Sequence, residues 1–221
     1  MGQLSPKLAD CTFYGIVDTG YVAPEMLFDK CVQIADAGVK IIQLRAKKED
    51  SPTRRNLAFE LLPIFKKRQD VFFIINDDIE LAAEICSLIP NAGLHIGQDD
   101  GDPKSVRSEI GYDRVLGLST HSIEQATAAD NLHDVLDYFA VGPVYATNTK
   151  PGRPAVGLEL VEKVATSNPR LPWFCIGGVN AKTAAQVRKA GGQRIVAVSD
   201  VLVPNDTTEA VKSLVATFLG K

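Results

Sequence analysis

Three positively charged side chains in this sequence follow apolar segments. Arg45 and Lys47 lie at the end of the apolar run VKIIQLRA, and Lys150 comes shortly after the run YFAVGPV. Because side chains alternate in direction along an extended segment, Gln43, Arg45 and Lys47 share one face. Fixed cations of this kind suit a polyanion such as a diphosphate. The sequence therefore predicts a site for a polyphosphate ligand.

Two carboxylates follow apolar runs in the same way, Asp77 after VFFIIN and Asp100 after GLHIG. Two unit charges ~4 Å apart interact by about 1 kcal/mol in water and about 4 kcal/mol at an effective dielectric of 20. Carboxylates would therefore repel a diphosphate unless a divalent cation lay between them. Oxygen ligands of this type favour Mg²⁺ over Zn²⁺. An alternative is a structural network in which Arg45 and Lys47 pair with the aspartates.

These residues can act together only if the fold brings the segment ends to one place. Eight apolar, strand-like runs alternate with segments of helical spacing and short connections, which predicts the α/β class and a (β/α)₈ TIM barrel as a single domain over residues 1–221. An open doubly wound sheet is the alternative, but its first turn should be rich in glycine, and Asp18-Thr19-Gly20-Tyr21 is not. The predicted strands are Phe13–Asp18, Val39–Ala46, Val71–Asn76, Gly93–Gly97, Arg114–Thr120, Tyr138–Val144, Trp173–Gly178 and Arg194–Ser199.

The predicted helices are placed by apolar spacing and by residues that cap helix N-termini. Ser51, Ser122 and Asn180 are expected to be such N-caps, with Pro52 in the first helical turn. The predicted helices are Pro24–Ala37, Ser51 to about Gln69, Ile79–Ser87, segments starting at Pro103 and Ser122, a segment near Gly157–Thr166, a segment starting at Asn180, and about Thr207–Leu219.

In such a barrel the active site lies at the mouth formed by the carboxyl ends of the strands. A single polar strand end, such as Ser119 or Asp200, could simply cap the next helix, but many polar strand ends at one mouth favour an active site. A Gly177-Gly178 turn opening a helix, with Ser199 after the last strand, predicts a second site for a monophosphate. The alternative is that the glycine pair serves only a tight turn. His121 is expected to be a loop or helix-cap residue.

Composition excludes several other classes of function. The chain has 221 residues, 45% of them hydrophobic, and a formal net charge of −3. No Lys/Arg block stands out, so nucleic acid is not an expected partner. Apolar runs are far shorter than the ~20 residues that a membrane-spanning helix needs, and the first residues lack the apolar core of a signal peptide. Four scattered cysteines without C-x-x-C spacing predict a reduced, cytoplasmic protein.

The sequence resembles the thiamine-phosphate synthase (thiamine-phosphate pyrophosphorylase) family over about Phe13 to Val201. The Gly-Gln-x-Asp and Thr-x-Thr-Lys segments are the most specific, and the motifs follow the family's order and spacing. The matching segments are Gln43-Leu44-Arg45-Ala46-Lys47, Ile75-Asn76-Asp77, Leu94-His95-Ile96-Gly97-Gln98-Asp99-Asp100, Gly117-Leu118-Ser119-Thr120-His121, Val141–Lys150 and Ile176-Gly177-Gly178-Val179.

This resemblance implies a Mg²⁺-dependent transferase. The family joins 4-amino-2-methyl-5-hydroxymethylpyrimidine diphosphate to 4-methyl-5-(2-hydroxyethyl)thiazole phosphate, giving thiamine phosphate and pyrophosphate. Diphosphate leaves first, and the thiazole nitrogen captures the resulting pyrimidine-methyl cation. The resemblance leaves the oligomeric state open, so a homo-oligomer is possible.

The resemblance also implies roles for individual residues. Asp77 and Asp100 would bind Mg²⁺. The implied substrate ligands are Arg45, Lys47, Asn76 and Lys150 for the diphosphate, Gln43 and Ser119 for the aminopyrimidine, Thr147 and Thr149 along the paths of the diphosphate and the thiazole phosphate, Gly178, Val198 and Ser199 for the thiazole phosphate, and His95 at a site position without a specified role.

Two positions depart from the family pattern. Asp78 stands where a basic or aromatic residue is common, which adds a second candidate carboxylate beside Asp77, and Ala146 replaces a common proline. A thiazole tautomerase of the same fold is an alternative function, but it handles one phosphate and needs no diphosphate–metal residues. A non-catalytic barrel that binds thiamine phosphates is a third possibility.

Overall fold

Eight parallel strands form a closed barrel in the computed structural model, which describes residues 8, 10–147 and 154–221. Each strand pairs with the next along the chain, and β1 closes the barrel by pairing with β8. The predicted (β/α)₈ TIM barrel is confirmed. The strands are β1 Phe13–Asp18, β2 Ile41–Arg45, β3 Phe72–Asn76, β4 Ala92–Ile96, β5 Val115–Thr120, β6 Tyr138–Val141, β7 Trp173–Cys175 and β8 Ile195–Ala197.

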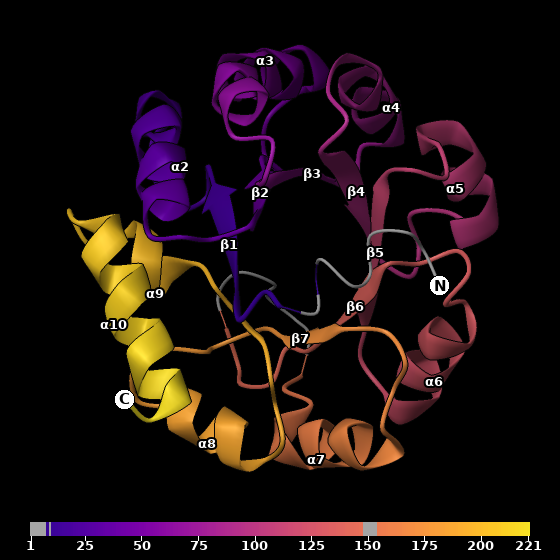
Figure 1. The fold of residues 1–221 in the computed structure, drawn as a ribbon, viewed down its shortest axis with the longest axis vertical. Helices are drawn as coiled ribbons and strands as arrows, with labels where there is room; N and C mark the ends of the chain where they lie inside the picture. Colours follow the sequence, from indigo (N-terminus) through magenta and orange to yellow (C-terminus); the bar gives the residue numbers. More distant parts are fainter. Residues whose placement is uncertain (1–7, 9, 148–153) are drawn as a thin grey trace.

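Helices surround the strands as an outer ring, which is seen end-on in Figure 1. Each strand is followed by at least one helix, and two helices follow β8. The helices are η1 Pro24–Met26, α2 Leu27–Asp36, α3 Ser51–Lys67, α4 Ile79–Leu88, α5 Pro103–Ile110, α6 Ile123–Asn131, α7 Gly157–Ser167, α8 Ala184–Lys189, α9 Ser199–Leu202 and α10 Thr207–Leu219. Within the described residues, none of these helices is long and apolar enough to cross a membrane.

Alternation along each strand divides the apolar side chains between two layers. In β1, Phe13 and Val17 belong to the large cluster that packs between strands and helices. Tyr14 and Ile16 belong to a smaller cluster with Tyr138 of β6. Since β1 and β6 are not neighbours in the sheet, their contact lies inside the barrel. The polar strand ends are therefore supported from within by a packed interior.

Helix starts differ from the prediction at two places. Ser51 is the first residue of α3 rather than its N-cap, because the Asp50 carboxylate accepts the Thr53 amide at 2.9 Å. Asn180 does not start a helix: its side chain accepts the Lys182 amide in a turn, and α8 begins only at Ala184. Ser122 caps α6 as predicted.

The predicted strands β6 and β7 are longer than the observed ones. β6 ends at Val141, before the cis peptide bond Gly142-Pro143, and β7 ends at Cys175. Beyond these ends, the Val144 amide donates to the Ile176 carbonyl at 2.8 Å, so the two segments stay side by side as a loop pair. The short helix α9 directly after β8 was not predicted. These changes shape the mouth but leave its position unchanged.

Candidate active site

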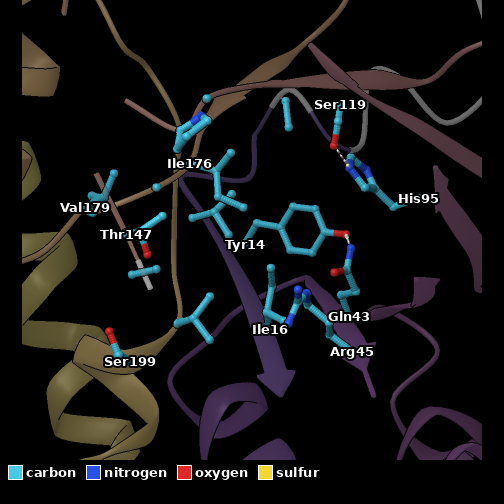
Figure 2. Close-up of a pocket in the computed structure, with 18 of the residues that line it drawn as sticks. Tyr14, Ile16, Gln43, Arg45, His95, Ser119, Thr147, Ile176, Val179 and Ser199 are labelled. Carbon is cyan, nitrogen blue, oxygen red and sulfur yellow. Dashed lines mark hydrogen bonds between the residues drawn. The ribbon is translucent and has the colours of Figure 1, made fainter. Parts of the chain in front are cut away.

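A pocket lies at the carboxyl ends of the strands, where the sequence predicted a site (Figure 2). Its lining comes from strands on all sides of the barrel. The structure therefore gathers most of the predicted site residues into one cavity. The predicted residues that line it are Gln43, Arg45, Asn76, His95, Ser119, Thr147, Gly178, Val198 and Ser199. Thr149 and Lys150 lie outside the described residues.

Lys47, Asp77 and Asp100 form a charged cluster beside this pocket. The Lys47 ammonium lies 2.7 Å from the Asp77 carboxylate, and the Asp77 and Asp100 carboxyl groups are close enough that each shifts the pKa of the other. Asp77 directly follows Asn76, which lines the pocket. The backbone of Asp77 is left-handed, with φ 62°, a conformation that is unfavourable for a residue with a Cβ and is enriched at functional sites.

The electrostatics of the two aspartates are opposite. For Asp77, burial raises the pKa, but the hydrogen bond and charge of Lys47, with a contribution from Asp100, outweigh burial and lower the pKa below its ordinary value. For Asp100, burial and the neighbouring Asp77 carboxylate raise the pKa, although the Gly97 amide donates to Asp100 at 2.7 Å. Two carboxylates this close repel each other, and a nearby cation reduces that repulsion.

This pair fits a divalent cation that is shared with a substrate. Among the described residues, no group of three or more His, Cys, Asp or Glu side chains is arranged to hold a metal ion. Two carboxylates leave most coordination positions to other oxygens. Mg²⁺ is commonly bound in this way, by one or two carboxylates together with substrate phosphates and water. Asp77 and Asp100 are thus suited to Mg²⁺ bound with a phosphorylated ligand.

Asp78 is occupied by structural contacts. One of its oxygens accepts the Leu81 amide at 3.1 Å and caps α4, and the other accepts Arg54 Nε at 3.0 Å. Arg54 also donates to the Glu49 carbonyl at 2.7 Å. Arg54 therefore joins the loop after β2 to the start of α4. Of the two neighbouring aspartates, it is Asp77 that faces Asp100.

Arg45 is positioned by Asp18, a residue that the sequence analysis did not identify as part of the site. Arg45 Nη1 donates to Asp18 Oδ2 at 2.7 Å, and the Asp18 carboxylate is 1% exposed. The Gly20 amide donates to the other Asp18 oxygen at 2.8 Å. The predicted alternative pairing of cations with aspartates thus holds for Lys47 and Asp77, but Arg45 takes a different partner. Asp18 could have been predicted as a site residue from the sequence, because it is a carboxylate at the end of the apolar run FYGIVD.

A chain of hydrogen bonds crosses the barrel beneath the pocket. Gln43 Nε2 donates to the Tyr14 hydroxyl at 2.8 Å, and that hydroxyl lies 2.9 Å from the Tyr138 hydroxyl. His95 lies 3.0 Å from Tyr138 through Nδ1 and 2.9 Å from Ser119 Oγ through Nε2. Figure 2 shows the Tyr14 ring pointing toward Gln43, with His95 and Ser119 on the same side as Gln43. The sequence analysis missed both tyrosines because they read as ordinary core residues.

Ile176, Val179, Thr147 and Ser199 lie on the other side of Tyr14 from Gln43 (Figure 2), and the Gly177-Gly178 turn joins Ile176 to Val179. Both glycines have positive φ, 98° and 65°. A Cβ on Gly177 would lie 2.5 Å from Pro143, and one on Gly178 would lie 2.6 Å from the Tyr145 Cβ, so both positions require glycine. The prediction that this turn opens a helix directly is wrong, since α8 starts at Ala184.

Three residues in this part of the pocket have uncommitted backbone amides. Among the described residues, the amides of Gly178, Val179 and Ser199 donate to no protein acceptor. All three residues line the pocket. The Gly178 carbonyl, by contrast, is fixed by Thr183 Oγ1 at 2.8 Å. Uncommitted amides on a rigid turn are suited to bind an anion.

His121 also lines the pocket, which the sequence analysis did not predict. It lies in the loop after β5, as expected, but its Nδ1 contacts the Gly142 carbonyl. The Gln125 side chain accepts the His121 amide at 2.7 Å. Ser119 and His121 both belong to the predicted end of this strand, but His121 was interpreted as a loop or helix-cap residue rather than as a site residue.

Comparison with known proteins gives one consistent result. Residues 13–201 match the model of a family described as thiamine monophosphate synthase. The thiamine-phosphate synthase of Arthrobacter sp. (strain FB24) is 41% identical over 200 residues, which cover 81% of this chain and 82% of that protein. The thiamine-phosphate synthase of Thermus thermophilus is 39% identical over 191 residues, covering 86% of this chain and 88% of that protein.

Solved structures agree on the architecture. Thiamine phosphate pyrophosphorylase from Pyrococcus furiosus has a TM-score of 0.79 and 24% identity, with 99% of this chain and 98% of that chain covered. A 3-hexulose-6-phosphate synthase has a TM-score of 0.63 and 18% identity, covering 93% and 99%. At these identities the structural likeness establishes the barrel fold.

Proposed function

The chain belongs to the thiamine monophosphate synthase (thiamine-phosphate synthase) family and is a transferase, and from this we propose that its barrel joins a pyrimidine diphosphate to a thiazole phosphate with the help of Mg²⁺. The substrates would be 4-amino-2-methyl-5-hydroxymethylpyrimidine diphosphate and 4-methyl-5-(2-hydroxyethyl)thiazole phosphate. The products would be thiamine phosphate and pyrophosphate.

The contact between Asp77 and Asp100 is the observation that carries this proposal. A ligand with a single phosphate would not explain why two carboxylates lie next to each other beside a cationic pocket. They suit a diphosphate whose oxygens complete the coordination of Mg²⁺. When bound, Mg²⁺ would neutralise the charge that develops on the departing diphosphate. Lys47, held 2.7 Å from Asp77, would lie next to the same phosphates.

Fixed cations would bind the diphosphate from the other side. Arg45 is aimed by the buried Asp18, so its guanidinium has little freedom to turn away from the pocket. Asn76 lines the same wall. We assign Lys150 and Thr149 to the diphosphate as well, from the family motif. Preorganised charge of this kind stabilises a leaving group without a proton donor.

The aminopyrimidine would lie between Gln43 and Ser119. Both side chains are buried, at 2% and 5% exposure, and both line the pocket. Each is held by one hydrogen bond, Gln43 to Tyr14 and Ser119 to His95. Their remaining hydrogen-bonding groups are therefore available to a ligand.

The thiazole phosphate would bind the amides of Gly178 and of the Val198-Ser199 turn, with Thr147 alongside. Thr147 and Ser199 lie across the pocket from Gln43 (Figure 2). Such an arrangement would hold the thiazole nitrogen near the carbon that loses diphosphate. Capture of a short-lived cation then needs only proximity, not a nucleophilic side chain.

Two alternative functions predict different outcomes from this reaction. A thiazole tautomerase would turn over a thiazole phosphate alone and would not need Asp77 or Asp100. A non-catalytic binder would hold thiamine phosphates without forming pyrophosphate. The four cysteines, all described, form no disulfide, which supports a cytoplasmic site of action.

The direct test mixes the purified protein with both phosphorylated precursors and Mg²⁺ and measures thiamine phosphate and pyrophosphate. We expect equal amounts of both products, and none when either precursor is omitted. Conversion of a thiazole phosphate alone would favour the tautomerase. Binding without any product, by protein whose native fold is checked by circular dichroism, would favour the binder.

A further inference from the structure

The proposed function assigns substrate contacts to the two residues at the ends of the hydrogen-bond chain beneath the pocket. It assigns no role to the three residues between them. Gln43 and Ser119 are the ends, and Tyr14, Tyr138 and His95 join them. The chain draws on five different strands, β2, β1, β6, β4 and β5 in that order.

The interior is shaped for these two phenols. The Tyr14 and Tyr138 rings meet edge to face, with centroids 5.7 Å apart, and each also packs against Phe174. Gly117 has no side chain where a Cβ would lie 2.1 Å from the Tyr138 ring. Burial raises the pKa of both tyrosines, so each remains a neutral hydroxyl with one proton to donate.

The orientation of the Gln43 amide, together with hydrogen-bond counting, sets the direction of the chain. The Gln43 amide nitrogen can only donate, so the Tyr14 oxygen accepts there. If Tyr138 also donated to Tyr14, the Tyr14 proton would have no acceptor in a fully buried site, which is unfavourable. Tyr14 therefore donates to Tyr138.

The same counting continues through the imidazole. Tyr138 has one proton left, and it donates to His95 Nδ1. His95 then carries its own proton on Nε2 and donates to Ser119 Oγ. Ser119 is left with a hydroxyl proton and no acceptor among the described residues. That proton is available to a ligand in the pocket.

At the other end of the hydrogen-bond chain, Gln43 presents an acceptor rather than a donor. Its amide nitrogen is committed to Tyr14, and its Oε1 accepts from none of the described residues. The pocket therefore presents an acceptor from Gln43 and a donor from Ser119. A ligand edge with an N–H donor beside a bare ring nitrogen is complementary to this pair.

We propose that Tyr14, Tyr138 and His95 act as positioning residues that set the hydrogen-bond polarity of Gln43 and Ser119, and so make the pocket prefer an aminopyrimidine over the corresponding oxopyrimidine. The oxopyrimidine carries a carbonyl and a ring N–H at that edge, the reverse of what the chain presents. The preference for this ligand class depends on the proposed function, whereas the direction of the chain depends on the structure alone.

The first experiment tests direction without any turnover. The protein has three histidines, so the ¹⁵N signals of His95 can be assigned by comparison with His95→Gln. In the wild-type protein we expect His95 to be neutral and protonated on Nε2. Protonation on Nδ1 would overturn the proposal.

The second experiment breaks the chain with Tyr138→Phe, which keeps the ring and its packing. Binding of the aminopyrimidine diphosphate and of its 4-oxo counterpart is measured by calorimetry with Mg²⁺ present. We expect the ratio of the two dissociation constants to fall by about tenfold or more, because Ser119 loses its fixed role as a donor. Affinity for the thiazole phosphate should not change.

The control is Tyr112→Phe, which removes a hydroxyl from a tyrosine that is 72% exposed. It should keep the wild-type ratio. An unchanged ratio in Tyr138→Phe, with the native fold shown by circular dichroism, would overturn the proposal. The expected tautomer and ratio in a protein that forms no thiamine phosphate would support the hydrogen-bond chain and contradict only the proposed reaction.

Discussion

Arg45 Nη1 lies 2.7 Å from the carboxylate of Asp18, which is 1% exposed at the end of β1. This pair links two neighbouring strand ends and aims a guanidinium along the wall of the pocket. A buried carboxylate needs its partner, so the two residues should be coupled in stability as well as in activity.

Replacing Arg45 should therefore affect folding. In Arg45→Ala, we expect the free energy of unfolding to fall by about 3 kcal/mol, because the Asp18 charge stays buried without its guanidinium. The double variant Asp18→Asn/Arg45→Ala should recover much of that loss while remaining nearly inactive. Urea denaturation and steady-state rates measure both effects. Equal stability of the single and double variants would show that the pair is not coupled.

Asp100→Asn should weaken Mg²⁺ binding while preserving the shape of the side chain. The amide oxygen can still accept the Gly97 N–H, but the charge that would bind the cation is lost. We expect the Mg²⁺ concentration for half-maximal rate to rise by about tenfold or more. Asp99→Asn, at an exposed neighbouring position, is the matched control and should leave the titration unchanged. The same midpoint in both variants would place the metal elsewhere.

Ser199→Asp should act on one substrate. A carboxylate at this position would lie against the phosphate of the thiazole substrate, and we expect its KM to rise by about tenfold or more, since two charges in such a site repel by one to a few kcal/mol. The KM of the pyrimidine diphosphate should change little. Ser199→Asn, similar in size but uncharged, separates charge from bulk. Equal increases for both substrates would contradict the assignment of two separate anion sites.

Asp78→Ala should change more than helix capping. Loss of the cap of α4 should cost about 1 kcal/mol of stability. The variant also releases Arg54, which holds the Glu49 carbonyl in the loop after Lys47. We therefore expect a higher KM for the pyrimidine diphosphate.

The control for this change is Asp102→Ala, which removes the cap of α5 without any contact to Arg54. Its loss of stability should be similar, and its KM values should stay at the wild-type level. Identical kinetics of the two variants would assign Asp78 to capping alone.

The strand order, and the position of most predicted site residues at one pocket, could be predicted because both follow local rules. Apolar runs of strand length locate β1 to β8, and a polar residue after each run locates the mouth. Boundaries failed where two residues compete for one role, as Asp50 and Ser51 do at the start of α3. β6 was predicted too long because the apolar residues continue past Val141 into a loop with the cis peptide bond Gly142-Pro143.

Contacts across the barrel could not be predicted in this way. Tyr14 and Tyr138 are 124 positions apart, and their meeting depends on the closure of all eight strands. The same holds for Asp18. The sequence predicts its position at the end of a strand, but it does not predict its ion pair with Arg45. Periodicity reports which face a side chain occupies, not which partner it finds there.

The proposed cation site between Asp77 and Asp100 can be tested directly with Mn²⁺, an oxygen-preferring ion that replaces Mg²⁺ and broadens nearby nuclear magnetic resonance signals. With inorganic pyrophosphate present as the phosphate ligand, Mn²⁺ should broaden the amide signals of Asp77 and of Gly97, which donates to Asp100. The broadening should be lost in the Asp77→Asn/Asp100→Asn variant. Broadening centred on other residues, with these two amides unaffected, would contradict the proposed metal site.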